Sequence, residues 1–83
     1  MSEILEILIP AVEEQLASPE TGYVRAAFER LLLEPDIDDA EAKKMIAVCL
    51  ADEMERMLKE AREFEERRYR TMLELLPTLP EQG

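Results

Sequence analysis

A run of seven residues without a polar side chain, residues 45–51 (MIAVCLA), limits what this chain can fold into more than any other feature. It lies inside residues 38–61, which contain no glycine or proline and are rich in residues of high helix propensity. Apolar residues recur through this stretch at helical spacing. Because the run is apolar all round, a helix that carries it is normally covered on several sides. The run is far too short to span a bilayer.

The start of this helix is marked in the sequence. Asp38 can cap the first turn, and Glu41 stands three residues later, as in a capping box. Asp39 and Glu41 also place negative charge at the positive end of the helix dipole. The sequence therefore predicts a helix over residues 39–61 whose central turns are buried.

The length of 83 residues predicts a single helical domain over residues 1–83, with a frayed tail over residues 78–83. A domain of this size buries roughly 60–65% of the surface of its unfolded chain, so its stability is small. One cysteine excludes an internal disulfide, and the lack of histidine removes the commonest transition-metal ligand. Association with another chain is therefore the expected source of extra stability. No secretory leader pattern is present, so a cytoplasmic location is expected.

The net charge of −10 is unevenly distributed. Residues 1–42 hold 11 acidic and 2 basic residues, whereas residues 43–83 hold 9 and 8. An acidic chain repels nucleic acid phosphates and anionic lipid, so both are disfavoured as partners. The acidic half could attract a basic protein, but solvated helix faces are the simpler interpretation.

The apolar periodicity predicts an all-α fold, a small bundle of three to four helices. The expected helices cover about residues 2–17, 20–33, 39–61 and 65–76. Pro10 should kink the first helix or delay its start, because proline lacks an amide hydrogen. Ser18 and Pro19 fit the N-cap and the first position of the second helix. We expect a turn near residues 62–64, because an unbroken helix would be about 57 Å long.

Carboxylates that adjoin the apolar stripes are the best candidates for a metal site: Glu13, Glu14, Asp52 and Glu53. If the helices that carry them pack antiparallel, one carboxylate from each could meet at the edge of the core. Oxygen ligands suit magnesium or manganese. Acidic residues also come together by chance in a helical chain that is rich in them. Charge on the helix surface is therefore the favoured interpretation of these four carboxylates. We assign no metal, cofactor or catalytic residue.

Three other residues have possible chemical roles. Arg25 and Arg30 are the only bases in the acidic first half and could form an anion site. An ion pair with Glu13 or Glu14 across the first two helices is favoured, because arginine suits partly buried carboxylate pairs. Cys49 has no histidine in the chain to activate it as a nucleophile, so a buried core thiol is expected.

Several segments are familiar in combination: VEEQL at residues 12–16, RAAFERL at residues 25–31, CLA at residues 49–51, and Tyr69 with Leu73. Their order over residues 4–76 resembles the C-terminal half of an uncharacterised bacterial family, domain of unknown function 1841. The resemblance implies an all-α fold with a turn before the helix that carries Tyr69. It implies no established activity. The family carries histidines where this chain has Leu5, Ile9 and Lys44, so a metal site built on them would be lost here.

The leading functional hypothesis is non-enzymatic self-association as a C2 homodimer. It rests on an all-round apolar run in a chain too short to cover it well. The residues expected at the interface or in the core are Met45, Ile46, Val48, Cys49, Leu50 and Met54. Two alternatives stay open. One is hydrolysis of a nucleotide or phosphate ester at a divalent metal held by the carboxylates, and the other is an acidic adaptor for a basic partner.

Overall fold

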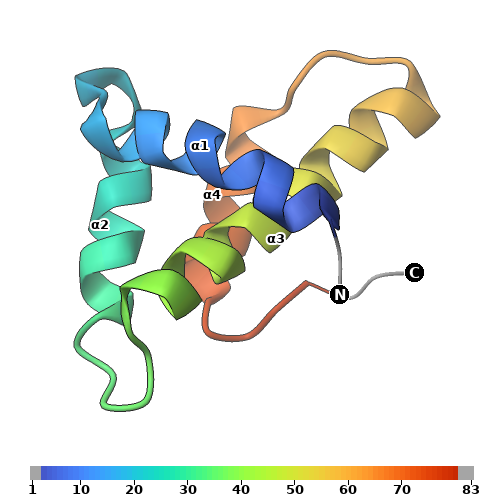
Figure 1. The fold of residues 1–83 in the computed structure, drawn as a ribbon. Helices are drawn as coiled ribbons and strands as arrows, with labels where there is room; N and C mark the ends of the chain where they lie inside the picture. Colours follow the sequence, from blue (N-terminus) through green and yellow to red (C-terminus); the bar gives the residue numbers. More distant parts are fainter. Residues whose placement is uncertain (1–2, 81–83) are drawn as a thin grey trace.

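The computed structural model describes residues 3–80 and is all-α over that range (Figure 1). The prediction of a small helical bundle is confirmed, and the helix boundaries lie close to those expected. The expected helical position of Ser2 and the tail residues 81–83 lie outside the described residues. No described helix is both long and apolar enough to cross a membrane. The elements are α1 (Glu3–Ala17), the short 3-10 helix η1 (Pro19–Thr21), α2 (Gly22–Leu31), α3 (Asp39–Glu60) and α4 (Glu66–Leu75).

The capping residues predicted from the sequence have the expected geometry. Asp38 has an extended backbone, and its Oδ1 accepts a hydrogen bond from the amide of Glu41 at 2.8 Å, so it caps α3. Ser18 caps η1, with Pro19 at the first position. The structure differs from the prediction in one detail, since this short turn precedes α2 and α2 itself begins at Gly22.

Pro10 lies inside α1, which is a continuous helix from Glu3 to Ala17. A delayed helix start, one of the two effects expected of this proline, is therefore not observed within the described residues. Pro10 is exposed, so water can reach the backbone carbonyl that its missing amide hydrogen leaves unpaired.

The turn predicted near residues 62–64 is confirmed. Ala61 ends α3 in the left-handed conformation, with φ 51° and ψ 48°, and is the only non-glycine residue with positive φ among residues 3–80. The amide of Arg62 donates to the carbonyl of Met57 at 3.1 Å, which closes the helix end. The chain then runs without regular structure to Glu66, where α4 begins.

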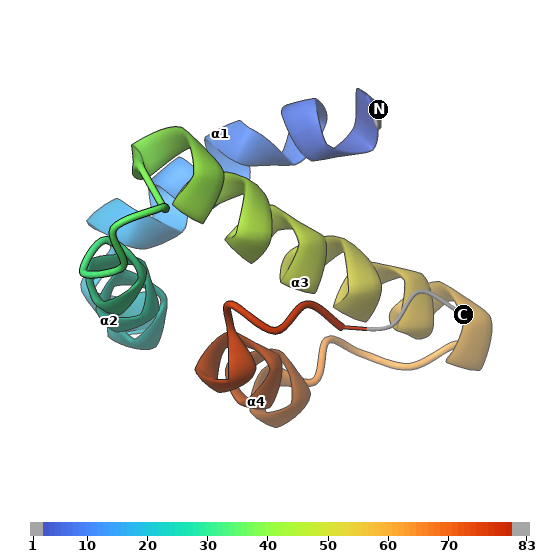
Figure 2. The same cartoon turned by 90° about the horizontal axis from the view of Figure 1, so that it is seen from below.

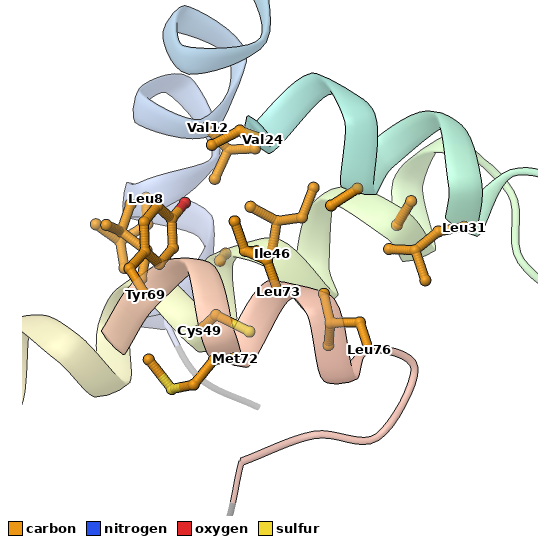
Figure 3. Close-up of a cluster of buried hydrophobic side chains, with 14 residues drawn as sticks. Leu8, Val12, Val24, Leu31, Ile46, Cys49, Tyr69, Met72, Leu73 and Leu76 are labelled. Carbon is orange, nitrogen blue, oxygen red and sulfur yellow. The ribbon is translucent and has the colours of Figure 1, made fainter. Parts of the chain in front are cut away.

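One apolar core lies between the four helices (Figure 3). Tyr69 is the largest of its fully buried side chains. Its hydroxyl donates to Oε1 of Gln15 at 2.6 Å, which joins α4 to α1. Its ring packs edge-on against Tyr23 and Phe64, at centroid distances of 6.1 and 5.4 Å. The buried apolar residues are Leu8, Val12, Val24, Ala27, Leu31, Ala42, Ile46, Ala47, Cys49, Leu50, Tyr69, Met72, Leu73 and Leu76.

The crossing of α1 and α3 leaves part of α3 uncovered. α1 packs mainly on α3, and the two helices move apart toward the start of α1 and the end of α3 (Figure 2). Both views show that α3 continues beyond the described start of α1 (Figures 1 and 2). The second half of α3 therefore extends past the helix that covers its first half.

Candidate functional site

The seven-residue run lies at the centre of the core. Of the residues expected at the interface or in the core, three are buried by other parts of the same chain: Ile46, Cys49 and Leu50. Met45 and Val48 are half-buried, and Met54 is exposed. The burial of the run therefore does not require a second chain, and the exposed apolar residues nearby become the informative ones.

Exposure rises along one row of α3. Ile46, Leu50, Met54 and Leu58 stand four residues apart, so they follow one another along the helix surface. Their exposed fractions are 0%, 5%, 41% and 84%. The increase follows largely from helix geometry, because each step of four residues turns about 40° round the axis and so places Leu58 about 120° from Ile46. α3 also continues beyond the start of α1 (Figure 2). A row that begins in the core therefore ends in solvent.

A matching row leads out of the core along α1. Val12 and Leu8 are 0% and 9% exposed, whereas Ile4, one turn before Leu8, is 55% exposed. Ile7 is 69% exposed. The start of α1 and the second half of α3 lie at the same end of the molecule in both views (Figures 1 and 2). The exposed side chains there, which we call the apolar end, are Ile4, Ile7, Met54 and Leu58.

Two carboxylates are buried in the second half of α3. Glu53 is fully buried and accepts hydrogen bonds from Arg62 Nη1 at 2.7 Å, Arg68 Nη1 at 2.9 Å and the amide of Glu65 at 2.6 Å. Arg68 also forms an ion pair with Asp52. These contacts tie the segment after α3 and the first turn of α4 to α3. We call the side chains of Asp52, Glu53, Arg62 and Arg68 the Glu53 cluster.

The environment of Glu53 keeps it ionised. Burial raises the pKa of Glu53, but the hydrogen bonds from Arg62, the Glu65 amide and Arg68 together lower it to about 2. Both carboxylate oxygens accept hydrogen bonds from protein donors. A group with this pKa is poorly matched to general acid–base chemistry near neutral pH. The geometry therefore gives the Glu53 cluster a structural role.

The structure does not bring the four candidate carboxylates together as one ligand set. Glu13 and Glu14 are exposed on α1, and Glu13 Oε2 accepts a hydrogen bond from Lys43 Nζ at 3.1 Å. Asp52 and Glu53 instead face arginines. Within residues 3–80, no group of three or more acidic, histidine or cysteine side chains is placed to hold a metal ion.

Arg25 and Arg30 do not pair with the glutamates of α1 in the described structure, so that expectation is wrong. Arg25 Nε pairs with Glu29 Oε2 at 3.0 Å, one turn along the same exposed helix face. Arg30 Nη2 donates to the carbonyls of Leu73 and Leu76 at 3.0 and 2.8 Å. The physical reason is the packing of α2 on α4, which brings Arg30 to backbone carbonyls at the end of α4.

Arg62 and Arg68 could not be predicted from the sequence as partners of Glu53. One signal was present, because Glu53 stands seven residues after Ile46 and so falls on the buried face of the same helix. A carboxylate at a core position requires a donor or a cation. The spacing along the chain, however, does not reveal which of the later arginines supplies it.

Cys49 is a free, buried cysteine. Burial, and then the charge of Asp52, raise the pKa of its thiol to about 12. The thiol is therefore protonated near neutral pH and lacks the thiolate character that nucleophilic chemistry requires.

Comparison of the chain with protein-family models, curated proteins and solved structures gave no match. The resemblance to the uncharacterised bacterial family stays a prediction.

Proposed function

We propose that this protein is a non-enzymatic helical module that acts by self-association, as a C2 homodimer formed through the apolar end. The supporting observation is that two apolar rows leave the core on α1 and α3 and end in solvent at the same end of the molecule. Exposed apolar side chains on two helices that reach the same end of the molecule are candidates for burial against a second chain. Full burial of each such side chain contributes roughly 1.5–3 kcal/mol.

The geometry gives less support to a metal-dependent hydrolase, because Asp52 and Glu53 already accept hydrogen bonds from arginines. The acidic adaptor for a basic partner stays a prediction, since no contact in the structure bears on it. We also propose a cytoplasmic location.

Light scattering after size exclusion, over roughly a hundredfold range of concentration, tests the proposal. We expect a mass near twice that of the 9.6 kDa chain. Leu58→Glu should give a monomer, because it places a charge in the proposed interface. Leu33→Glu is the matched control, since Leu33 is 83% exposed against 84% for Leu58 but follows α2, away from the apolar end. A wild-type monomer at every concentration contradicts the proposal.

A further inference from the structure

We propose that residues 62–80, which we call the strap and which include α4, open as one unit while α1, α2 and α3 stay folded. Opening exposes Cys49, which is fully buried when the strap is closed. The strap is a conformational device within one chain. The proposal therefore goes beyond the proposed self-association and does not depend on it.

The three helices before the strap pack against one another without its help. α1 packs on α2 and on α3, and α2 packs on α3, so each pair of these helices is in contact. Ten of the fourteen buried apolar side chains belong to these three helices. The strap contributes the other four, Tyr69, Met72, Leu73 and Leu76. The three helices therefore keep their mutual contacts and most of the core when the strap leaves.

Polar contacts tie the strap to the rest of the chain at both ends. At its start, Nη1 of Arg62 and Nη1 of Arg68 donate to the carboxylate of Glu53 at 2.7 and 2.9 Å. At its end, Nη2 of Arg30 donates to two backbone carbonyls at the end of α4. Water replaces these hydrogen bonds when the strap opens, so each one stabilises the closed state only modestly.

The strap has little stability of its own once it is detached. α4 has ten residues, and its N-cap residue Glu65 makes no capping hydrogen bond with its side chain. Isolated helices shorter than about 12–15 residues are marginal in water. Docking against α2 and α3 therefore holds α4 in its helical form, and undocking and loss of helix occur together. The left-handed residue Ala61 marks the boundary between α3 and the strap.

Cys49 is a natural probe of this opening, because it is the only cysteine in the chain. It lies in the same part of the core as Tyr69 and Met72 of α4 (Figure 3). Burial, and then the charge of Cys49, raise the pKa of Tyr69 above its ordinary value, which agrees with a thiol close to the phenol. A thiol reagent in solution should therefore reach Cys49 when the strap is open.

The test follows the labelling of Cys49 by 5,5′-dithiobis(2-nitrobenzoate) over a series of urea concentrations below the unfolding transition. It uses the Leu58→Glu background, so that association through the apolar end does not contribute. The slope of the opening free energy with urea should be less than about half of the slope for global unfolding, because opening exposes only part of the buried surface. Urea unfolding followed by circular dichroism gives the global slope.

Two variants loosen the two ends of the strap. Glu53→Gln should raise the labelling rate in the absence of urea roughly 30-fold, and Arg30→Gln roughly tenfold. Glu55→Gln and Arg25→Gln are the matched controls, since their ion pairs lie within one helix, and should change the rate by less than about twofold. Circular dichroism checks that each variant is folded. Arg30→Gln gives the answer by itself if Glu53→Gln does not fold.

The outcomes are distinct. A shallow urea slope together with faster labelling of Glu53→Gln or Arg30→Gln supports the strap. A labelling slope equal to the global slope overturns it, because Cys49 is then reached only by complete unfolding. Labelling that neither variant accelerates overturns it as well, because the reagent then reaches the thiol without release of α4. Neither failure bears on the proposed self-association, which the solution mass decides.

Discussion

The two halves of α3 place apolar and charged residues in opposite ways. In the first half, Ile46 is buried and Glu41 and Lys44 face solvent, as in an ordinary amphipathic helix. In the second half, Glu53 is fully buried and Leu58 is mostly exposed. Leu58 lies about 120° round the helix from Ile46, and the two halves of α3 also differ in the elements that cover them. α1 packs on the first half, whereas the second half is met by an arginine-bearing segment that leaves its apolar row open.

This contrast shows that residue type alone does not decide burial in a small bundle. Glu53 can be buried because Arg62, Arg68 and a backbone amide supply donors to both of its oxygens. Leu58 stands five residues after Glu53, which places it about 140° round the helix from that buried side chain, and it is 84% exposed. The end of α3 is consequently the place where a partner would add apolar burial.

The largest expected effect comes from comparing two positions on the same row of α3. Ile46→Ala should lower the free energy of unfolding by about 3–4 kcal/mol, because it creates a cavity in the core. Leu58→Ala should change it by less than about 0.5 kcal/mol in dilute, monomeric solution. Urea unfolding followed by circular dichroism measures both values. Equal losses of unfolding free energy for Ile46→Ala and Leu58→Ala would contradict the difference in burial between these two positions of α3.

The next effect concerns the buried charge. Glu53→Gln should lower the free energy of unfolding by about 2–3 kcal/mol, because the arginines and the Glu65 amide lose their ionised acceptor. Glu55→Gln is the control, since Glu55 is an exposed acid in the same half of the helix and should change stability by less than about 0.5 kcal/mol. Urea unfolding of the two variants side by side gives the comparison. A loss for Glu53→Gln as small as for Glu55→Gln would exclude a structural role for the Glu53 cluster.

The stabilising effect of Glu53, measured against Glu53→Gln, should depend on pH. The pKa of Glu53 is about 2 in the folded protein, against about 4.3 in the unfolded chain. The stabilisation from its charge is therefore present above about pH 5 and is lost as the pH falls toward 2. The difference in unfolding free energy between wild type and Glu53→Gln should shrink over that range. A difference that stays constant from neutral pH to pH 2 would mean that the folded pKa is not lowered.

The smallest expected effect is a gain in stability at the end of α3. Ala61 is held in the left-handed conformation, which glycine adopts without the steric cost that a Cβ brings. Ala61→Gly should raise the free energy of unfolding by about 0.5–1 kcal/mol. Ala26→Gly, at an exposed interior position of α2, should lower it by about 1 kcal/mol. Urea unfolding of both variants measures these changes. A lower free energy of unfolding for both Ala61→Gly and Ala26→Gly would argue against a left-handed conformation at Ala61.

Local signals made the helices predictable. Asp38 caps α3 through an amide three residues away, and Ser18 with Pro19 starts the turn before α2, so both act over a few residues. The break after α3 was also expected from the length of an unbroken helix. The core set Ile46, Cys49 and Leu50 followed from helical periodicity.

Contacts between distant residues were not predictable in the same way. Arg68 meets Glu53 across 15 positions, and Arg30 meets the carbonyl of Leu76 across 46. Each contact depends on how the chain turns between the two residues. The sequence placed Glu13 and Glu53 in one candidate ligand set, whereas the fold gives them different cationic partners, Lys43 and Arg62.

By itself, the sequence determined the positions of the helices, their caps and the apolar rows, because propensity, capping and periodicity act within a few residues. Only the tertiary structure decided which part of each row is covered. That outcome depends on how α1 crosses α3 and how far α3 extends past it (Figure 2). No local pattern specifies either quantity, because both depend on contacts between residues far apart in the sequence.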